Sequence, residues 1–292
     1  MKVVRIACQG NPLAIAQAHM VMQAIRDHNP LMVPELRTLP PGQPGQSASI
    51  IFYRLARALE NSTADLCVHS LKNMPIQDNP KFPIVAVGHR EDCRSVMVLP
   101  RRHCRPDVSR PLGCHEIRLK MQLSGIFPGW KTQQAPPDIV AALNKLDGGE
   151  YGALITSADE LTYLRLQGRI YQTFSISQII PGWGQGIVAV QGRAGEKTGY
   201  LSQLHSVDCW DMALAERAYA QILGNTLMAG NASVWGEKIT VHGMLADQYG
   251  KMWEGVLSGK REDAAQIGAA LAARLRLDAS GQVLRGKKLY DG

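Results

Sequence analysis

The first 70 residues alternate strand-like and helix-like patterns, and this order constrains the fold more than any other feature of the chain. Short apolar runs at residues 3–8, 31–38 and 64–70 predict strands. Between them, residues 13–29 and 50–62 place apolar side chains at helical spacing. Strands that alternate with helices favour a mainly parallel sheet. The sequence therefore predicts an α/β fold.

The same patterns predict further elements along the chain. We expect strands at 83–92, 153–157, 238–246 and 251–259, and helices at 116–126, 138–151, 158–170, 210–225 and 262–277. The last part of the chain therefore forms a smaller α+β unit. The glycine-rich segment at 182–186, GWGQG, precedes a strand instead of opening a helix. It therefore predicts a tight turn or hinge, not a dinucleotide site.

Composition favours a globular protein with an anionic partner. The chain has 292 residues and a net charge of +7, and a basic balance favours acidic ligands. The basic runs at 101–105 and 285–288 lack the interleaved aromatics of a single-strand binder, so we expect no nucleic acid. The N-terminal apolar run is too short for a signal peptide, and no run approaches 18 apolar residues. We expect a cytoplasmic monomer that makes no contact with a membrane.

The six cysteines are dispersed along the chain, which indicates a reducing compartment. Five cysteine and histidine residues lie near one another in the sequence and raise the possibility of a zinc site: Cys93, His103, Cys104, Cys114 and His115. They lack the close CxxC pairs of structural zinc sites, so we predict no metal.

Polar residues follow the strand predicted at 64–70, where α/β proteins place their chemistry. The tip presents Ser70, Lys72 and Asn73 but no acid. His69 beside Ser70 suggests nucleophile chemistry, although no GxSxG elbow surrounds it. A histidine packed at the end of a strand is the competing interpretation.

Six segments occur in an order that resembles the porphobilinogen deaminase (hydroxymethylbilane synthase) family. They are RIACQGNPLAIAQAHMV, ADLCVHSLKNMP, GHREDCRSVMV, NKLDGGEYGALI, PGWGQGIVAV and ALAERA. The resemblance implies three domains, two of them like type II periplasmic binding proteins with hinge crossovers and the third a small α+β domain. We expect the first at 1–90 and 186–204, the second at 94–184 and the third at 205–292.

The family condenses four porphobilinogen units with release of ammonia in tetrapyrrole synthesis. Its catalytic aspartate follows a lysine, and that pair appears here as Lys72 and Asn73. An asparagine carries no charge and is no general base near neutral pH. The family also attaches a dipyrromethane cofactor to a cysteine of the third domain. Here Cys209 is the last cysteine and precedes that loop, equated with 223–233, so we expect no cofactor.

The resemblance also implies arginines that clamp carboxylates. The position of the first such arginine holds Gln9 in this chain. The family's Ser-Ser-Leu-Arg-Arg segment aligns with residues 115–119, where Arg118 is the one arginine retained. Three further arginine positions hold Pro136, Ala142 and Tyr163. The predicted catalytic positions are Lys72 and Asn73. The predicted ligand-binding residues are Gln9, Asn11, His69, Ser70, Cys114, His115, Arg118 and Gln185.

Three functions stay open. The first is a repurposed family member, or pseudoenzyme, that binds a small anionic or pyrrole-type ligand in the interdomain cleft, alone or as an accessory to a partner enzyme. The second is an enzyme of different chemistry that uses Lys72, His69, His115 or Cys114. The third is a divergent but working hydroxymethylbilane synthase.

Overall fold

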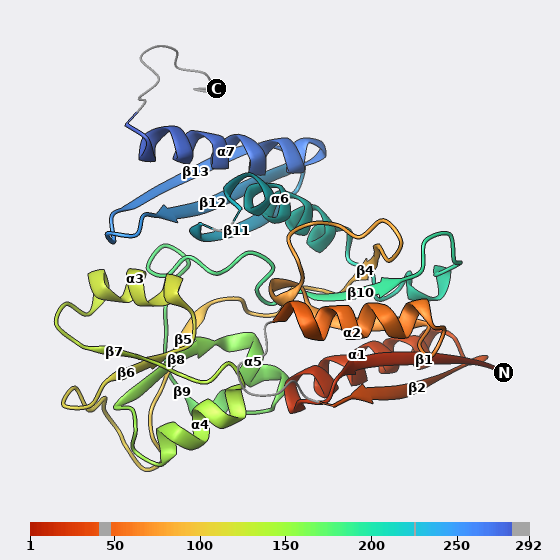
Figure 1. Cartoon of the computed structure of the whole chain (residues 1–292), viewed down its shortest axis with the longest axis horizontal. Coiled ribbons are helices and arrows are strands. Elements are labelled where there is room, and N and C mark those ends of the chain that lie inside the picture. The colour runs from red at the N-terminus through yellow and green to blue at the C-terminus, as the bar shows by residue number, and fades with distance from the viewer. Residues whose placement is uncertain (41–47, 225, 282–292) are drawn as a thin grey trace.

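Three sheets divide the chain into three structural units (Figure 1). The computed structural model describes residues 1–40, 48–224 and 226–281, and the basic run at 285–288 lies outside them. Within the described ranges, no helix is long and apolar enough to cross a bilayer. In Figure 1 the first unit lies at the lower right, the second at the lower left and the third above both.

The first sheet has the strand order β2-β1-β3-β10-β4. Its strands are β1 (Lys2–Gln9), β2 (Met32–Leu39), β3 (Leu66–Ser70), β4 (Ile84–Val87) and β10 (Val188–Gly192). Strand β1 runs parallel to β2 and β3, as the sequence predicts, whereas β10 is antiparallel to β3 and β4. The antiparallel strand enters from the second unit, so its direction is set by a long-range crossover that local patterns do not contain.

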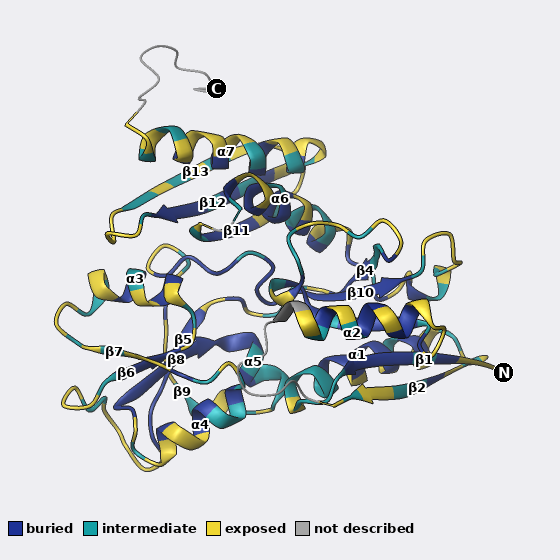
Figure 2. Ribbon diagram, in the orientation of Figure 1, coloured by how far each residue is buried: buried dark blue, intermediate teal, exposed yellow. Residues whose placement is uncertain are grey.

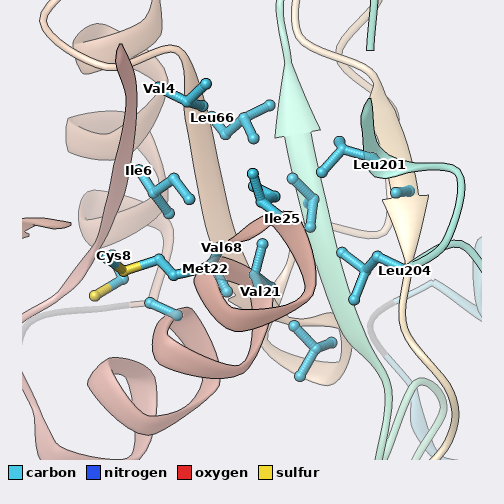
Figure 3. Close-up of a cluster of buried hydrophobic side chains, with 14 residues drawn as sticks. Val4, Ile6, Cys8, Val21, Met22, Ile25, Leu66, Val68, Leu201 and Leu204 are labelled. Carbon is cyan, nitrogen blue, oxygen red and sulfur yellow. The ribbon is translucent and has the colours of Figure 1, made fainter. Parts of the chain in front are cut away.

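Helix α1 (Pro12–His28) covers one face of this sheet, and α2 (Ala48–Glu60) packs on the other face. The side chain of Asn11 caps α1 by accepting a hydrogen bond from the amide of Ala14 at 2.8 Å. Figure 3 shows Val21 and Ile25 of α1 against the strand residues Ile6 and Val68. All four are 2% exposed or less, so the apolar stripe of the helix seals the core.

The second sheet has the order β7-β6-β8-β5-β9. Its strands are β5 (Ser95–Val98), β6 (Leu112–Cys114), β7 (Thr132–Gln134), β8 (Ala153–Ser157) and β9 (Ile170–Thr173). Its helices are α3 (Ile117–Ile126), α4 (Ile139–Asp147) and α5 (Ala158–Tyr163). The helix expected at 158–170 ends early, because Arg165 adopts a left-handed φ of 57° and the chain turns into β9.

The third unit is an antiparallel meander covered by two helices. Its elements are α6 (Val207–Leu223), β11 (Leu227–Trp235), β12 (Lys238–Ala246), β13 (Met252–Lys260) and α7 (Ala264–Ala279). The segment at 223–233 is therefore largely strand β11, paired with β12, and not the loop that the sequence comparison suggests. Figure 2 shows buried residues in β11 and β12 and the exposed outer face of α7 above them.

A buried ion pair ties the units together where the hinge segments meet. Arg90 donates to both carboxylate oxygens of Glu216, and Glu216 is completely buried. The same carboxylate accepts hydrogen bonds from the amides of Gly184 and Ala232, each at 2.6 Å. Gly184 has a φ of 69°, which suits glycine, so GWGQG forms the expected turn.

The predicted fold class is confirmed as an α/β architecture with two mixed five-stranded sheets and a smaller α+β unit. The chain leaves the first sheet after β4 and returns to it in β10. The residue boundaries assigned to the three domains stay predictions.

Candidate functional site

A cavity of about 920 Å³ lies between the first and second units. Its walls come from the ends of β1, β3, β6 and β8 and from the helices that follow them. Residues at 226 and 228, from the third unit, also border it. A space of this size suits a small molecule with several functional groups.

Nine of the ten predicted site residues line this cavity: Gln9, Asn11, His69, Ser70, Lys72, Asn73, His115, Arg118 and Gln185. Cys114 does not line it, because side chains alternate along a strand and that of Cys114 is buried in the core of the second unit. Burial raises the pKa of the Cys114 thiol to about 11, so the thiol is protonated near neutral pH. The ligand-binding roles of the lining residues stay predictions.

Two of the lining side chains also have structural partners. Asn11 uses its side-chain oxygen to cap α1. Gln185 is 1% exposed, accepts from Arg118 at 2.8 Å and donates to the carbonyl of Cys93 at 2.6 Å. Its amide therefore holds Arg118 in place at the hinge.

The tip that follows β3 is a short 3₁₀ turn, Leu71–Asn73. Leu71 is fully buried and its amide donates to the carbonyl of Ile187 at 2.8 Å. This anchor leaves Lys72 and Asn73 at the cavity, where Asn73 is exposed. The geometry explains why a residue at position 73 can meet a ligand.

Two glutamates of the second unit face Lys72, and the sequence analysis did not predict either as a site residue. The Nζ of Lys72 lies 2.8 Å from Oε1 of Glu160 and 3.8 Å from Oε1 of Glu116. Glu160 also accepts from the hydroxyl of Thr156, and Glu116 pairs with Arg118. Glu160 lies three residues after the predicted strand 153–157, so the strand-end rule could have found it. Glu116 follows β6, which is too short to be predicted from the sequence.

Burial and opposite charges together set the ionisation of this cluster. Burial raises the pKa of Glu116, but Arg118 and Lys72 outweigh it and lower that pKa to about 2. The pKa of Glu160 is likewise lowered, chiefly by Lys72, against the effect of burial. Burial lowers the pKa of Lys72, but the neighbouring carboxylates outweigh this effect and raise the pKa above its usual value. The cluster therefore combines two cations with two carboxylates near neutral pH.

His69 lies on the cavity wall and packs against Phe52, with ring centroids 5.6 Å apart. Its Nε2 is buried and has no hydrogen-bond partner within the described ranges. Burial lowers the pKa of His69 to about 4, so the ring is neutral near pH 7. Within the same ranges, no group of three or more His, Cys, Asp or Glu side chains is placed to hold a metal ion.

Comparisons with known proteins point to one family. The family model described as "Porphobilinogen deaminase, dipyromethane cofactor binding domain" matches residues 4–199. A porphobilinogen deaminase of Ruminiclostridium josui is 32% identical and aligns with 94% of this chain and 98% of that protein. One from Acetivibrio thermocellus is 34% identical, over 93% of this chain and 97% of its own. A substrate-binding domain assigned to a molybdenum ABC transporter of Clostridium difficile covers 71% of this chain and 93% of its own, at 12% identity and a TM-score of 0.48.

The expectation that no cofactor is involved is wrong. The matching model is named for the dipyrromethane cofactor, so the family to which residues 4–199 are similar carries that group. The expectation rested on the positions of the cysteines. These positions bear on covalent attachment of the cofactor through a thiol, but not on its binding by polar contacts in a cleft. The cavity offers Lys72 and Arg118 to the carboxylates of such a group, whereas none of the six cysteines lines it. The cavity lining thus suits polar contacts with a dipyrromethane group, and no cysteine thiol lines the cavity.

Proposed function

Because the chain belongs to the porphobilinogen deaminase family, we propose that its interdomain cavity binds a small pyrrole-type carboxylate and that the chain is repurposed from porphobilinogen polymerisation. The observation that carries the proposal is the exposed Asn73 beside Lys72 on the cavity wall. An amide at this point accepts and donates hydrogen bonds but neither stabilises a cationic intermediate by charge nor removes a proton.

Cations on opposite walls support the proposed ligand class. Lys72 comes from the first unit and Arg118 from the second, and both line the one cavity. A planar guanidinium pairs with a carboxylate through two hydrogen bonds, and an ammonium adds a point charge. A ligand with two carboxylates could therefore bridge the two units.

A second candidate is a working hydroxymethylbilane synthase. The names of the relatives favour it, since proteins that align with more than nine-tenths of this chain are porphobilinogen deaminases. An enzyme of different chemistry has weaker support. Lys72 is held as a cation by Glu160, and Cys114 is buried away from the cavity, so neither is an activated nucleophile.

The deciding experiment incubates the purified full chain with porphobilinogen. The proposal predicts saturable binding by calorimetry without turnover, measured as ammonia release and linear tetrapyrrole. Repeated release of ammonia would overturn it in favour of the second candidate. The intact mass and the reaction with Ehrlich's reagent show separately whether dipyrromethane is covalently attached to the chain.

A matched pair of variants tests where the ligand binds. Lys72→Met removes a cation from the cavity, whereas Lys145→Met removes one from an exposed pair with Glu150, outside it. We expect about tenfold weaker binding or more for the first, the loss of one charge-assisted hydrogen bond. The second should bind as the unaltered protein does. Equal affinities in both variants would place the ligand elsewhere.

A further inference from the structure

Strand β13 forms one edge of the third sheet, whose strand order is β11-β12-β13. Within the described part of the chain, its nine residues pair with β12 on one side only. The backbone groups of the other side form a row of donors and acceptors with which another strand can pair. Proline residues and bulges commonly interrupt such a row. Strand β13 has no proline and keeps an unbroken register with β12, so its outer edge is suited to pairing.

Two hydrogen bonds show which backbone groups of β13 point outward. The amide of Arg261 donates to the carbonyl of Glu237, on the β12 side, at 2.9 Å. Because the direction alternates along an antiparallel strand, odd-numbered residues bond to β12 and even-numbered residues point away from it. The exposed guanidinium of Arg274 accordingly donates to the carbonyl of Val256 from α7, at 3.3 Å. The outward row therefore belongs to the even-numbered residues of 252–260.

Two exposed charges are placed symmetrically about Leu257, at the middle of this row. Glu254 lies three residues before Leu257 and Lys260 three residues after it. Leu257 packs against the core beneath α7, so both charged side chains stand on the opposite face of the sheet. They are about 20 Å apart along the strand and cannot pair with each other. Charges on an edge strand usually discourage pairing, but two opposite charges at equal distances from a centre favour a second copy of the same strand.

The register follows from this symmetry. If two copies of β13 run antiparallel with Leu257 opposite Leu257, Glu254 of each copy lies opposite Lys260 of the other. Val256, which is 50% exposed, then lies opposite Ser258 of the second copy. Both of these residues belong to the outward row, so they exchange backbone hydrogen bonds. A shift by two residues in either direction leaves neither charge opposite its counter-charge, and the charges therefore select one register.

We propose that the outer edge of β13 is an interface between two copies of this chain, which pair antiparallel about Leu257 and join their third sheets into one continuous sheet. The two Glu254–Lys260 pairs are equivalent, as a closed two-fold interface requires. Among the described residues, none of β13 lines the cavity, so the interface and the ligand site are separate. The proposal differs from the monomer expected from the sequence, because the edge position of a strand exists only in the folded sheet.

Sedimentation velocity of the full chain from about 1 μM to about 1 mM tests the interface. A small interface gives a weak complex, so we expect the dimer to form towards the upper end of this range. Glu254→Lys and Lys260→Glu should each weaken dimerisation about tenfold or more, because each turns two attractions into two repulsions. The variant that carries both exchanges should regain most of the affinity, since the opposite charges meet again.

Glu150→Lys and Lys145→Glu are the matched controls, because they reverse the charges of an exposed ion pair in the second unit. They change the net charge by the same amounts and should leave dimerisation unaltered. Circular dichroism should show that every variant is folded. Amide hydrogen exchange of the unaltered chain needs no substitution. The amides of Glu254, Val256 and Ser258 should exchange more slowly as the protein concentration rises.

A chain that stays monomeric at about 1 mM would overturn the inference. So would a dimer whose affinity neither charge reversal in β13 changes, because the copies would then meet elsewhere. Protection of the three amides at every concentration would assign the edge to a segment of the same chain and would also overturn it. Each of these results leaves the proposed ligand binding standing, since β13 lies outside the cavity.

Discussion

The Nζ of Lys72 lies 2.8 Å from Oε1 of Glu160, and this ion pair joins two structural units across the cavity although the residues are 88 positions apart. Both side chains are less than 15% exposed. A pair in such a setting is costly to break from one side only, because the remaining charge loses its partner without regaining water.

The pair can be tested by a double-mutant cycle with Lys72→Met and Glu160→Gln. We expect each single variant to lower the free energy of unfolding by about 3 kcal/mol, as removal of one partner of a buried pair does. The double variant should lose about 0.5–3 kcal/mol less than the sum, because no charge is stranded. Urea denaturation at pH 7 measures all four proteins. Strict additivity would show that the two residues do not interact in solution.

Glu216 should be the most sensitive carboxylate of the hinge region. Glu216→Gln leaves the buried guanidinium of Arg90 without its counter-charge, and we expect a loss of about 3–5 kcal/mol. Glu262→Gln is the control, because its pair with Lys260 is more than 70% exposed on both sides and should change stability by less than about 1 kcal/mol. Comparable effects of the two substitutions would contradict the role assigned to the hinge pair.

The contact between α6 and α7 requires a glycine at position 268. A Cβ at Gly268 would lie 1.9 Å from the carbonyl oxygen of Ala215, a backbone atom that has no alternative rotamer. We expect Gly268→Ala to cost about 1–3 kcal/mol or more through overpacking. Gly125→Ala, in α3 with open space around the new methyl group, should stabilise by about 0.5–1 kcal/mol. Thermal unfolding separates the two, and shifts of the same sign would be inconsistent with the helix contact.

Stability should depend on pH through His69. Its folded-state pKa of about 4 is below the unfolded value of about 6.5. As the pH falls from 6.5, the unfolded chain takes up the proton first, so stability drops until about pH 4 and then levels. The contribution amounts to as much as ~3 kcal/mol. His69→Gln should flatten this part of the pH profile, and His103→Gln, on the exposed surface, should not. If the stability of His69→Gln fell by the same amount over this pH range, the pH dependence would come from other groups.

Much of the fold follows from local patterns. The alternation of apolar runs of strand and helix type predicted β1, α1, β2, α2 and β3 in order, because the spacing of apolar residues reflects the local geometry of each element. The short strands β6 and β7 were missed, since three residues carry too little periodicity. Strand β11 was missed because its glycine and polar residues resemble a loop until β12 pairs with it.

By itself, the sequence determined the family, the α/β class, the position of Lys72 at a strand end and the amide in place of an acid at position 73. The tertiary structure alone decided which charges meet there. Glu116 and Glu160 are ordinary helix-start residues in the sequence, and they reach Lys72 only because the chain crosses between two sheets and closes a cavity. A charge acts over a few ångströms of space whatever its distance along the chain, so the electrostatics of the site are a property of the assembled units.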